Sequence, residues 1–210
     1  MAVHGAGMTE RMLQTDLTES RKTELRRAAI AWRDALPAAE RAAAAAAIAA
    51  RPLPVAVPVG AIVSGFSPLK SEINPVPLMR AFATAGAGLA LPAIAGKGKP
   101  LTMRAWTFGA PLVAGVWGIR EPGPQAPEVF PDILIVPLLV FDRAGHRIGY
   151  GAGYYDMTIA RLRGVKSVIA IGIAYAAQEV DLVPATPRDA ALDLVLTERE
   201  IIDCRDPRKT

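Results

Sequence analysis

The chain of 210 residues is poor in cysteine, histidine and aromatic side chains, and each shortage excludes a class of protein. Its single cysteine, Cys204, excludes an internal disulfide and any metal site built from several cysteines. The two histidines, His4 and His146, leave no way to assemble a Ser-His-Asp or Cys-His catalytic arrangement. Aromatic residues make up 6% of the chain and are not interleaved with clustered basic residues, which argues against a nucleic-acid-binding protein.

Long apolar runs are also missing, which bears on where the protein works. No run approaches the roughly 18 residues that a bilayer span requires, and the alanine tract over 42–50 is too short and too weakly apolar. The N-terminus shows no cationic start followed by an apolar stretch and a cleavage site, so no secretion signal is evident. We therefore expect a cytoplasmic protein with no membrane partner.

The charge balance is mildly basic, and the length bounds the number of domains. The net charge of +4 comes from 24 basic and 20 acidic residues, and a modest positive field suits phosphorylated small molecules. The length fits one domain with a full core. We expect a single α/β domain over 17–204, a disordered segment over 1–16 and a C-terminal tail over 205–210, with the protein acting as a monomer.

Hydrophobic patterns and turn residues predict alternating helices and strands. The expected helices cover 17–35, 38–50, 74–85 and 154–162. The expected strands cover 61–66, 88–92, 101–106, 133–141, 167–173 and 192–196. These strands are continuous apolar runs, which predicts a mostly parallel central sheet covered on both faces, that is, a three-layer α/β/α fold. The Gly/Pro-rich segment 109–131 is expected to be mostly loop, and loops of that length are usually functional.

The segment 141–156 carries the clearest functional pattern, with the sequence Phe-Asp-Arg-Ala-Gly-His-Arg-Ile-Gly-Tyr-Gly-Ala-Gly-Tyr-Tyr-Asp. Its alternating glycines, between a strand and a helix, leave the backbone open to a ligand at the carboxyl end of the strand. Unpaired amides at a helix start bind anions, while Arg147 and Asp156 add a cation and a metal-capable carboxylate. The pattern indicates a nucleotide-phosphate site with a divalent ion. A turn without ligand remains open, because the spacing matches neither the Rossmann fingerprint nor the P-loop.

The same segment resembles the signature of the 5-formyltetrahydrofolate cyclo-ligase family, also called methenyltetrahydrofolate synthetases. Weaker similarities follow in the family's order along the chain. They are Lys22 to Arg26 in a basic first helix, Ser71-Glu72-Ile73, the segment Trp-Gly-Ile-Arg-Glu-Pro over 117–122, and the Asp-containing segment 189–198. The similarity therefore extends from about residue 21 to about residue 198.

The resemblance implies a fold and an activity. The fold would be similar to that of the NagB/RpiA/CoA-transferase-like proteins, with three α/β/α layers. The activity would be cyclisation of 5-formyltetrahydrofolate to 5,10-methenyltetrahydrofolate, with ATP consumed and ADP and phosphate released. ATP would be the co-substrate and Mg²⁺ the cofactor.

The resemblance also assigns roles to residues that alone would be surface charges or packed aromatics. Lys22 and Arg26 lie four apart on one helix face, and they would reach the ATP phosphates rather than form only a solvated basic face. Arg147, Tyr154 and Asp156 would take part in catalysis. The ATP site would include the residues of the glycine turn and its flanks, namely Arg147, Gly149, Tyr150, Gly151, Ala152, Gly153, Tyr154 and Tyr155.

The folate site implied by the resemblance draws on three further residues. Glu72 would contact the pterin, although a carboxylate there could equally stabilise a helix start. Met103 and Trp117 would form walls of the pocket, and both residue types are more often plain core. Tyr154 and Tyr155 would lie at the mouth that the folate and nucleotide sites share.

A metal site would need two carboxylates that lie far apart in sequence. Asp156 and Asp189 would each, taken alone, be a helix cap or a surface charge. The resemblance assigns both to Mg²⁺, with water and phosphate oxygens in the remaining positions.

The sequence also departs from the family pattern. Leu138 follows Pro137 where relatives usually have glycine, Arg188 precedes Asp189 where histidine or asparagine is common, and Gly65-Phe66 replaces a polar-aromatic stretch. Leu138 could narrow the pocket or simply pack, and Arg188 could contact phosphate or disturb the metal site.

Two alternatives to the cyclo-ligase activity stay open. One is a diverged nucleotide-binding member of the family that lost the folate reaction. The other is a non-enzymatic regulator or RNA-binding module that uses the basic first helix.

Overall fold

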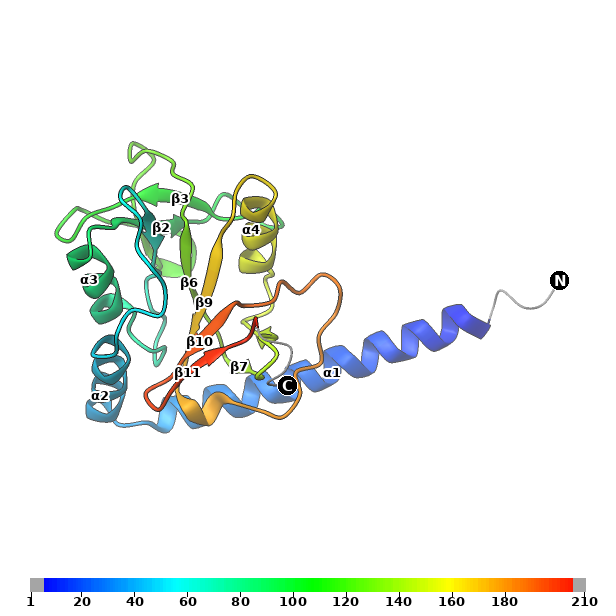
Figure 1. The fold of residues 1–210 in the computed structure, drawn as a ribbon. Helices are drawn as coiled ribbons and strands as arrows, with labels where there is room; N and C mark the ends of the chain where they lie inside the picture. The colour runs from blue at the N-terminus through cyan, green and yellow to red at the C-terminus, as the bar shows by residue number, and fades with distance from the viewer. Residues whose placement is uncertain (1–5, 206–210) are drawn as a thin grey trace.

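The computed structural model describes residues 6–205, with side chains described from residue 16 onward, and builds them around one central sheet (Figure 1). None of the described helices is both long and apolar enough to span a bilayer. The helices are α1 (Ala6–Ala35), α2 (Ala38–Ala49), α3 (Val76–Thr84) and α4 (Tyr154–Arg163), with short 3₁₀ helices η1 (Val116–Gly118) and η2 (Ala176–Gln178).

The central sheet has seven strands in the order β11-β10-β9-β6-β1-β2-β3. The five inner strands run parallel, and only the edge strands β3 and β11 are antiparallel to their neighbours. The strands are β1 (Ile62–Ser64), β2 (Gly88–Ala93), β3 (Thr102–Ala105), β6 (Ile133–Pro137), β9 (Ile169–Ile173), β10 (Leu194–Leu196) and β11 (Ile201–Asp203). The predicted mostly parallel sheet is confirmed, and the continuous apolar runs follow from its burial on both faces.

Helices cover both faces of the sheet, which confirms the three layers. Helices α2 and α3 lie on one face and α4 on the other (Figure 1). Ile48 of α2 and Phe82 of α3 belong to a core with Val63 and Ile135 of the sheet. On the opposite face Ile159 and the rest of α4 pack against alternate residues of the same strands, including Leu134, Val136, Ala170 and Val195.

Helix α1 packs outside these layers, beside a small hairpin, and its N-terminal part projects beyond the body (Figure 1). The hairpin pairs β7 (Val140–Phe141) with β8 (Arg147–Ile148). Leu25 and Ala29 of α1 pack against the buried residues of this hairpin region, Leu139, Val140, Ile148 and Val183. The helix is thereby fixed alongside the segment that the sequence singled out.

Two expected boundaries are corrected. The first helix begins at Ala6 and not at residue 17, so the part of the expected disordered segment over 6–16 is helical, and residues 1–5 lie outside the described residues. The strand expected over 133–141 ends at Pro137, whose ring removes an amide donor from the ladder, and the chain then enters the hairpin. The segment 109–131 is mostly loop, as expected, and contains a small two-stranded sheet, β4 (Val113–Ala114) with β5 (Arg120–Glu121).

Candidate functional site

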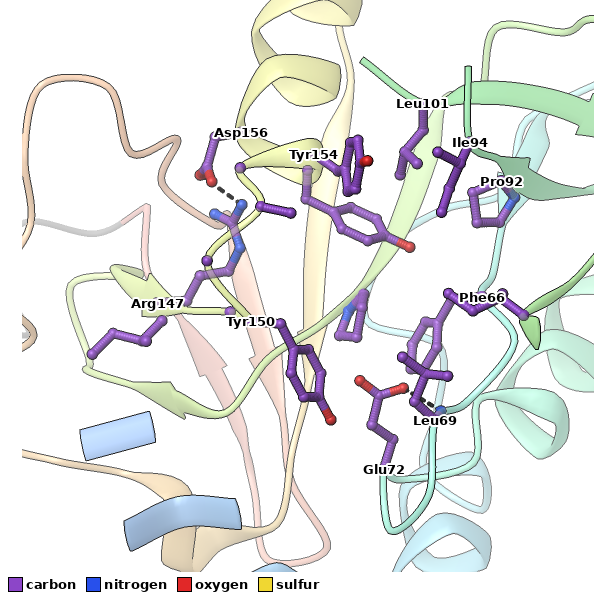
Figure 2. Close-up of a pocket in the computed structure, with 18 of the residues that line it drawn as sticks. Phe66, Leu69, Glu72, Pro92, Ile94, Leu101, Arg147, Tyr150, Tyr154 and Asp156 are labelled. Carbon is purple, nitrogen blue, oxygen red and sulfur yellow. Dashed lines mark hydrogen bonds and ion pairs between the residues drawn. The ribbon is translucent and has the colours of Figure 1, made fainter. Parts of the chain in front are cut away.

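A pocket of about 700 Å³ opens at the carboxyl edge of the parallel strands. Phe66 follows β1, Pro92 lies at the end of β2, and Pro137 ends β6, and all three line it. Ligands gather at this edge in open parallel sheets because the strand ends and the following loops converge there. Figure 2 shows Glu72 and Tyr150 projecting toward the same space from opposite segments of the chain.

The fold brings together almost every residue that the sequence assigned to the site. The pocket is lined by Lys22, Arg26, Glu72, Trp117, Arg147, Gly149, Tyr150, Gly151, Ala152, Gly153, Tyr154, Tyr155, Asp156 and Asp189. Met103 is the exception: it is 2% exposed in the core under α4, where Ser64 Oγ lies 3.1 Å from its sulfur. Met103 therefore does not form a wall of this pocket.

The glycine turn presents open backbone at the start of α4. Gly153 caps the helix in the left-handed region (φ 68°), without a side-chain cap for the helix amides. Gly151 is also left-handed (φ 98°), and a Cβ there would lie 3.6 Å from the Arg26 guanidinium. Because amides at a helix start lack partners and carry partial positive charge, the turn can bind an anion without a side chain.

Arg147 and Asp156 form a buried ion pair that joins the hairpin to α4. Arg147 donates to Asp156 Oδ1 over 2.7 Å and to the carbonyl of Ala190. The backbone amide of Ala190 donates to the same Oδ1 over 3.0 Å. Burial lowers the pKa of Arg147, and the Asp156 charge opposes that effect. The pair thus fixes the loop before β10 against the start of α4 and leaves Asp156 Oδ2 without a hydrogen bond within residues 16–205.

Lys22 and Arg26 are turned into the protein rather than toward solvent. Lys22, 5% exposed, donates to Asp189 Oδ2 over 2.8 Å, and Arg26 donates to the carbonyl of Gly149 over 3.0 Å. Asp189 Oδ2 also accepts from the amide and hydroxyl of Thr186. Burial would raise the pKa of Asp189, but the hydrogen bonds from Lys22 and Thr186 outweigh it, and the pKa is lowered.

Asp156 and Asp189 provide some of the oxygen ligands that a divalent ion requires. Asp156 and Asp189 line one pocket, and each has one carboxylate oxygen tied to a cation while the other accepts no hydrogen bond from the described side chains and backbone. Mg²⁺ commonly takes only one or two carboxylates and fills its other positions with water and phosphate oxygens. No cluster of three or more potential ligands occurs among residues the structure describes. The donor set therefore fits Mg²⁺ bound together with a phosphate, and not a closed all-protein site.

The other end of the pocket is mostly apolar, and the carboxylates of Glu72 and Glu121 are also part of its lining; the Ile94 amide donates to Glu121 Oε2 over 3.1 Å. Phe66, Leu69, Ile94 and Leu101 line it, as Figure 2 shows. Glu72 lies among them and accepts the amide of Leu69 over 2.7 Å through Oε2. Burial raises the pKa of Glu72, and this effect exceeds the lowering by the Leu69 amide, Arg33 and Tyr150.

Aromatic side chains lie between the two ends. The Trp117 and Tyr154 rings are 6.2 Å apart at 57°, and Trp117 is 69% exposed with a left-handed backbone (φ 58°). Trp117 therefore stands at the rim on η1 and is not a buried wall. The Tyr155 hydroxyl is enclosed and has no hydrogen-bond partner among the described residues, and burial raises its pKa. An enclosed hydroxyl without a partner is costly unless a ligand satisfies it.

One buried cation at this site was not predicted from the sequence. Arg33 of α1 donates to Ser71 Oγ over 3.1 Å and to the hydroxyl of Tyr150. The signal was present, because Arg33 follows Arg26 by seven residues and so shares its helix face. The resemblance named only Lys22 and Arg26 on this face of the first helix, so Arg33 was not included among the site residues.

The chain is similar to known proteins over most of its length. The family model described as the 5-formyltetrahydrofolate cyclo-ligase family matches residues 18–198. A 5-formyltetrahydrofolate cyclo-ligase of Mycolicibacterium smegmatis is 34% identical over 148 residues, which cover 67% of this chain and 75% of that protein.

Two solved structures resemble the fold. The NMR structure of Aquifex aeolicus 5,10-methenyltetrahydrofolate synthetase matches with a TM-score of 0.71 and 28% identity, over 89% of this chain and 94% of that one. A 5,10-methenyltetrahydrofolate synthetase from Mycoplasma pneumoniae matches with a TM-score of 0.64 and 21% identity, over 84% of this chain and 98% of that one, which shows the shared fold. With the family model matched over most of its length, the chain belongs to the 5-formyltetrahydrofolate cyclo-ligase family.

Proposed function

We propose that this protein converts 5-formyltetrahydrofolate to 5,10-methenyltetrahydrofolate and couples the ring closure to cleavage of ATP to ADP and phosphate, with Mg²⁺. The observation that carries the proposal is one pocket with two chemically different ends. One end holds cations and a helix start, and the other holds apolar walls around Glu72. Phosphate groups suit the first and a flat heterocycle with N–H donors suits the second.

At the cationic end, the chain would bind and align the phosphates. Lys22 and Arg26 are held toward the glycine turn, whose open backbone suits phosphate oxygens. Arg147 contributes a fixed planar set of donors beside Asp156. Asp156 and Asp189 would hold Mg²⁺, which when bound neutralises phosphate charge. In phosphoryl transfer most of the acceleration comes from such positioning and charge neutralisation.

At the apolar end, Glu72 would orient the pterin. A carboxylate accepts hydrogen bonds from the amino group and ring N–H of a pterin, and the surrounding apolar walls exclude water from the heterocycle. The enclosed hydroxyl of Tyr155, on the first turn of α4, is available for a hydrogen bond to substrate. Tyr154 and Trp117 would cover the ligand at the rim.

The reaction would proceed in two steps. The formyl oxygen attacks the γ-phosphorus of ATP, the bond between that phosphorus and its bridging oxygen breaks, and ADP leaves. The neighbouring folate amine then attacks the activated formyl carbon, its proton is lost, and the carbon–oxygen bond breaks to release phosphate. The residues of the pocket act by alignment, and none is required as a nucleophile.

The two alternatives receive less support from the arrangement of side chains. Leu138 is buried in the core and Arg188 is exposed, and neither lines the pocket, so these two departures give no reason to expect a lost folate reaction. The third departure places Phe66 in the pocket lining, where it adds an apolar wall at the folate end. Lys22 and Arg26 are engaged inside the protein, which weakens an RNA-binding use of α1. We expect a monomeric cytoplasmic enzyme without a nucleic-acid or membrane partner.

The test is direct. Purified protein is mixed with 5-formyltetrahydrofolate, ATP and Mg²⁺, and methenyltetrahydrofolate is followed by its absorbance, with ATP and Mg²⁺ each omitted in turn. Product that requires both is the expected result. ATP binding without product would identify the diverged nucleotide-binding alternative, and salt-sensitive RNA binding that survives Asp156→Ala would identify the regulator.

A further inference from the structure

Arg33 is the most completely buried charged side chain described at the site, with 1% of its surface exposed. A guanidinium stays charged at any physiological pH, so its burial is costly unless hydrogen bonds and counter-charges surround it. The groups that bind the Arg33 guanidinium should therefore show why it is buried.

The hydrogen bonds of Arg33 connect two segments of the pocket. Its Nε donates to Ser71 Oγ, on the residue just before Glu72, and its Nη2 donates to the hydroxyl of Tyr150 in the glycine turn. Its guanidinium carbon also lies 5.8 Å from the centre of the Tyr150 ring. The Ser71 hydroxyl in turn donates a hydrogen bond to Asp34 Oδ1. One rigid side chain therefore fixes the loop at the apolar end and the turn at the cationic end.

The charge of Arg33 also acts on Glu72. The groups with electrostatic influence in this region are Arg33 and Asp34 from α1, Tyr150 from the glycine turn, Tyr155 from α4 and Tyr175 from the segment before η2. Further charges act on the tyrosines: Arg147 on Tyr155, and Arg41 and Glu198 on Tyr175. Burial raises the pKa of each tyrosine, so all three are neutral near pH 7. Arg33 is the cation whose charge acts on Glu72 itself, and it opposes the burial that raises the pKa of Glu72.

We propose that Arg33 is a positioning residue that holds Tyr150 in place and supplies the charge facing the Glu72 carboxylate, so that the folate and nucleotide subsites are set by one buried guanidinium. This inference rests on the proposed function for its substrates. Arg33 does not line the pocket, so it acts through Glu72 and Tyr150.

The test compares pH profiles. Arg33→Gln removes the charge at similar length, Arg33→Lys keeps the charge but not the planar set of donors, and Arg27→Gln is the matched control on an exposed position of the same helix. The kcat/KM for 5-formyltetrahydrofolate is measured against pH at saturating ATP. In Arg33→Gln the acid limb is expected to move up by about one pH unit or more, since an opposite charge nearby commonly shifts a carboxyl pKa by 1–3 units.

The variants separate charge from geometry. Arg33→Lys is expected to restore the acid limb but to keep a raised KM for ATP, because Tyr150 has lost its anchored partner. Arg27→Gln should change neither quantity. In a Glu72→Gln background, Arg33→Gln should no longer move the acid limb, because the group that it acts on has gone.

A purely structural role would overturn the proposal. A structural role would appear as a fall in kcat and in thermal stability for Arg33→Gln while the acid limb of kcat/KM stays unchanged. It would also appear if Arg33→Gln moved the acid limb by the same amount in the Glu72→Gln background as in the wild type.

A measurement that needs no turnover separates this outcome from failure of the proposed function. The pKa of Glu72 is followed by ¹³C NMR of labelled glutamate carboxyls and assigned with Glu72→Gln. A raised Glu72 pKa in Arg33→Gln supports the inference even in a protein without cyclo-ligase activity, and an unchanged Glu72 pKa refutes it.

If Arg33→Gln does not fold, the hydrogen bond between Arg33 and Tyr150 is tested with Arg33→Lys and Tyr150→Phe. An unchanged KM for ATP in both variants refutes the proposal.

Discussion

At the scale of single residues, the buried carboxylate of Glu72 lowers the stability of the fold but suits the binding of substrate. The residue is 8% exposed beside apolar walls, and burial raises the pKa of its carboxyl group above the ordinary value of 4.5. A raised carboxyl pKa means that the folded state disfavours the ionised form more than the unfolded state does. The fold therefore bears a cost at neutral pH that a substrate-binding role would justify.

Glu72→Gln is expected to stabilise the fold while it lowers kcat/KM for the folate to a reduced but measurable value. The amide keeps an acceptor for the Leu69 amide but has no charge to desolvate, and each 1 kcal/mol gained raises the Tm by about 2–4 °C in a domain of this size. The gain should be largest at pH values above the raised pKa and should shrink as pH falls toward 4.5, where the wild-type carboxyl becomes protonated. Melting curves from pH 4 to pH 8 measure it, and a lower Tm in the variant across that range would contradict it.

Asp156 shows how the structure changes a sequence-based expectation. From sequence, Asp156→Ala would abolish turnover and spare the fold, because the residue was assigned only to the metal. The structure pairs it with buried Arg147, so the alanine variant should also lose about 2–3 kcal/mol of unfolding free energy, the low end for a buried pair because Asp156 is 26% exposed. Asp156→Asn keeps an acceptor for the Ala190 amide and should lose less. Urea unfolding compares them, and equal stability of alanine variant and wild type would show that the pair contributes nothing.

At the scale of elements, the packing of Leu138 answers a question that the sequence raised. Leu138 is 3% exposed, and a Cβ added at Gly172 on β9 would lie 2.8 Å from its Cδ2 and 2.6 Å from Leu192 Cδ1. The missing glycine after Pro137 is thus accommodated by a glycine on the neighbouring strand. Leu138 packs and does not narrow the pocket.

Leu138→Ala is therefore expected to cost about 2–5 kcal/mol of stability, as for other buried leucines, with KM for both substrates unchanged. Leu69→Ala is the matched control, because Leu69 is partly exposed and lines the pocket. It should raise KM for the folate at a smaller cost in stability. Urea titrations and steady-state kinetics on both variants decide, and a raised KM in Leu138→Ala would contradict the assignment.

Individual strands, helices and turns were predictable where one sequence pattern was clear. The apolar runs gave the parallel strands, and the alternating glycines gave a turn and the start of α4. The hairpin β7–β8 was missed because its apolar residues continue the run of β6, and only the proline at 137 marks the break. Met103 was misplaced because residue type alone does not distinguish a pocket wall from the core.

At the scale of the whole molecule, the site depends on contacts that no local pattern contains. Arg33 pairs with Ser71 and Tyr150, which are 38 and 117 residues away in the chain. The composition and the strand pattern predicted the layers, but the partner of each buried charge is set by how α1 lies against the hairpin. The short first-helix motif could identify Lys22 and Arg26 only by resemblance.

The projecting N-terminal part of α1 leads to a prediction about the domain boundary (Figure 1). Lys22, which pairs with Asp189, lies within the domain expected over 17–204. Because that domain keeps the pocket-lining residues of α1, deletion of residues 1–15 should leave kcat/KM within about twofold of wild type and the Tm nearly unchanged. A loss of activity in the deleted protein, with the wild type assayed in parallel, would place those residues in the functional unit.

The Lys22–Asp189 ion pair joins residues 167 positions apart, so it closes a loop that spans most of the polypeptide. Ring closures of that length are slow steps in folding, and a growing chain cannot make this one until its C-terminal part has left the ribosome. Helix α1 is synthesised well before Asp189, so Lys22 acquires its partner later than Arg26 and Arg33 can acquire theirs. Enzymatic activity should accordingly recover with the slowest kinetic phase of refolding, because the site is complete only when the native topology has formed.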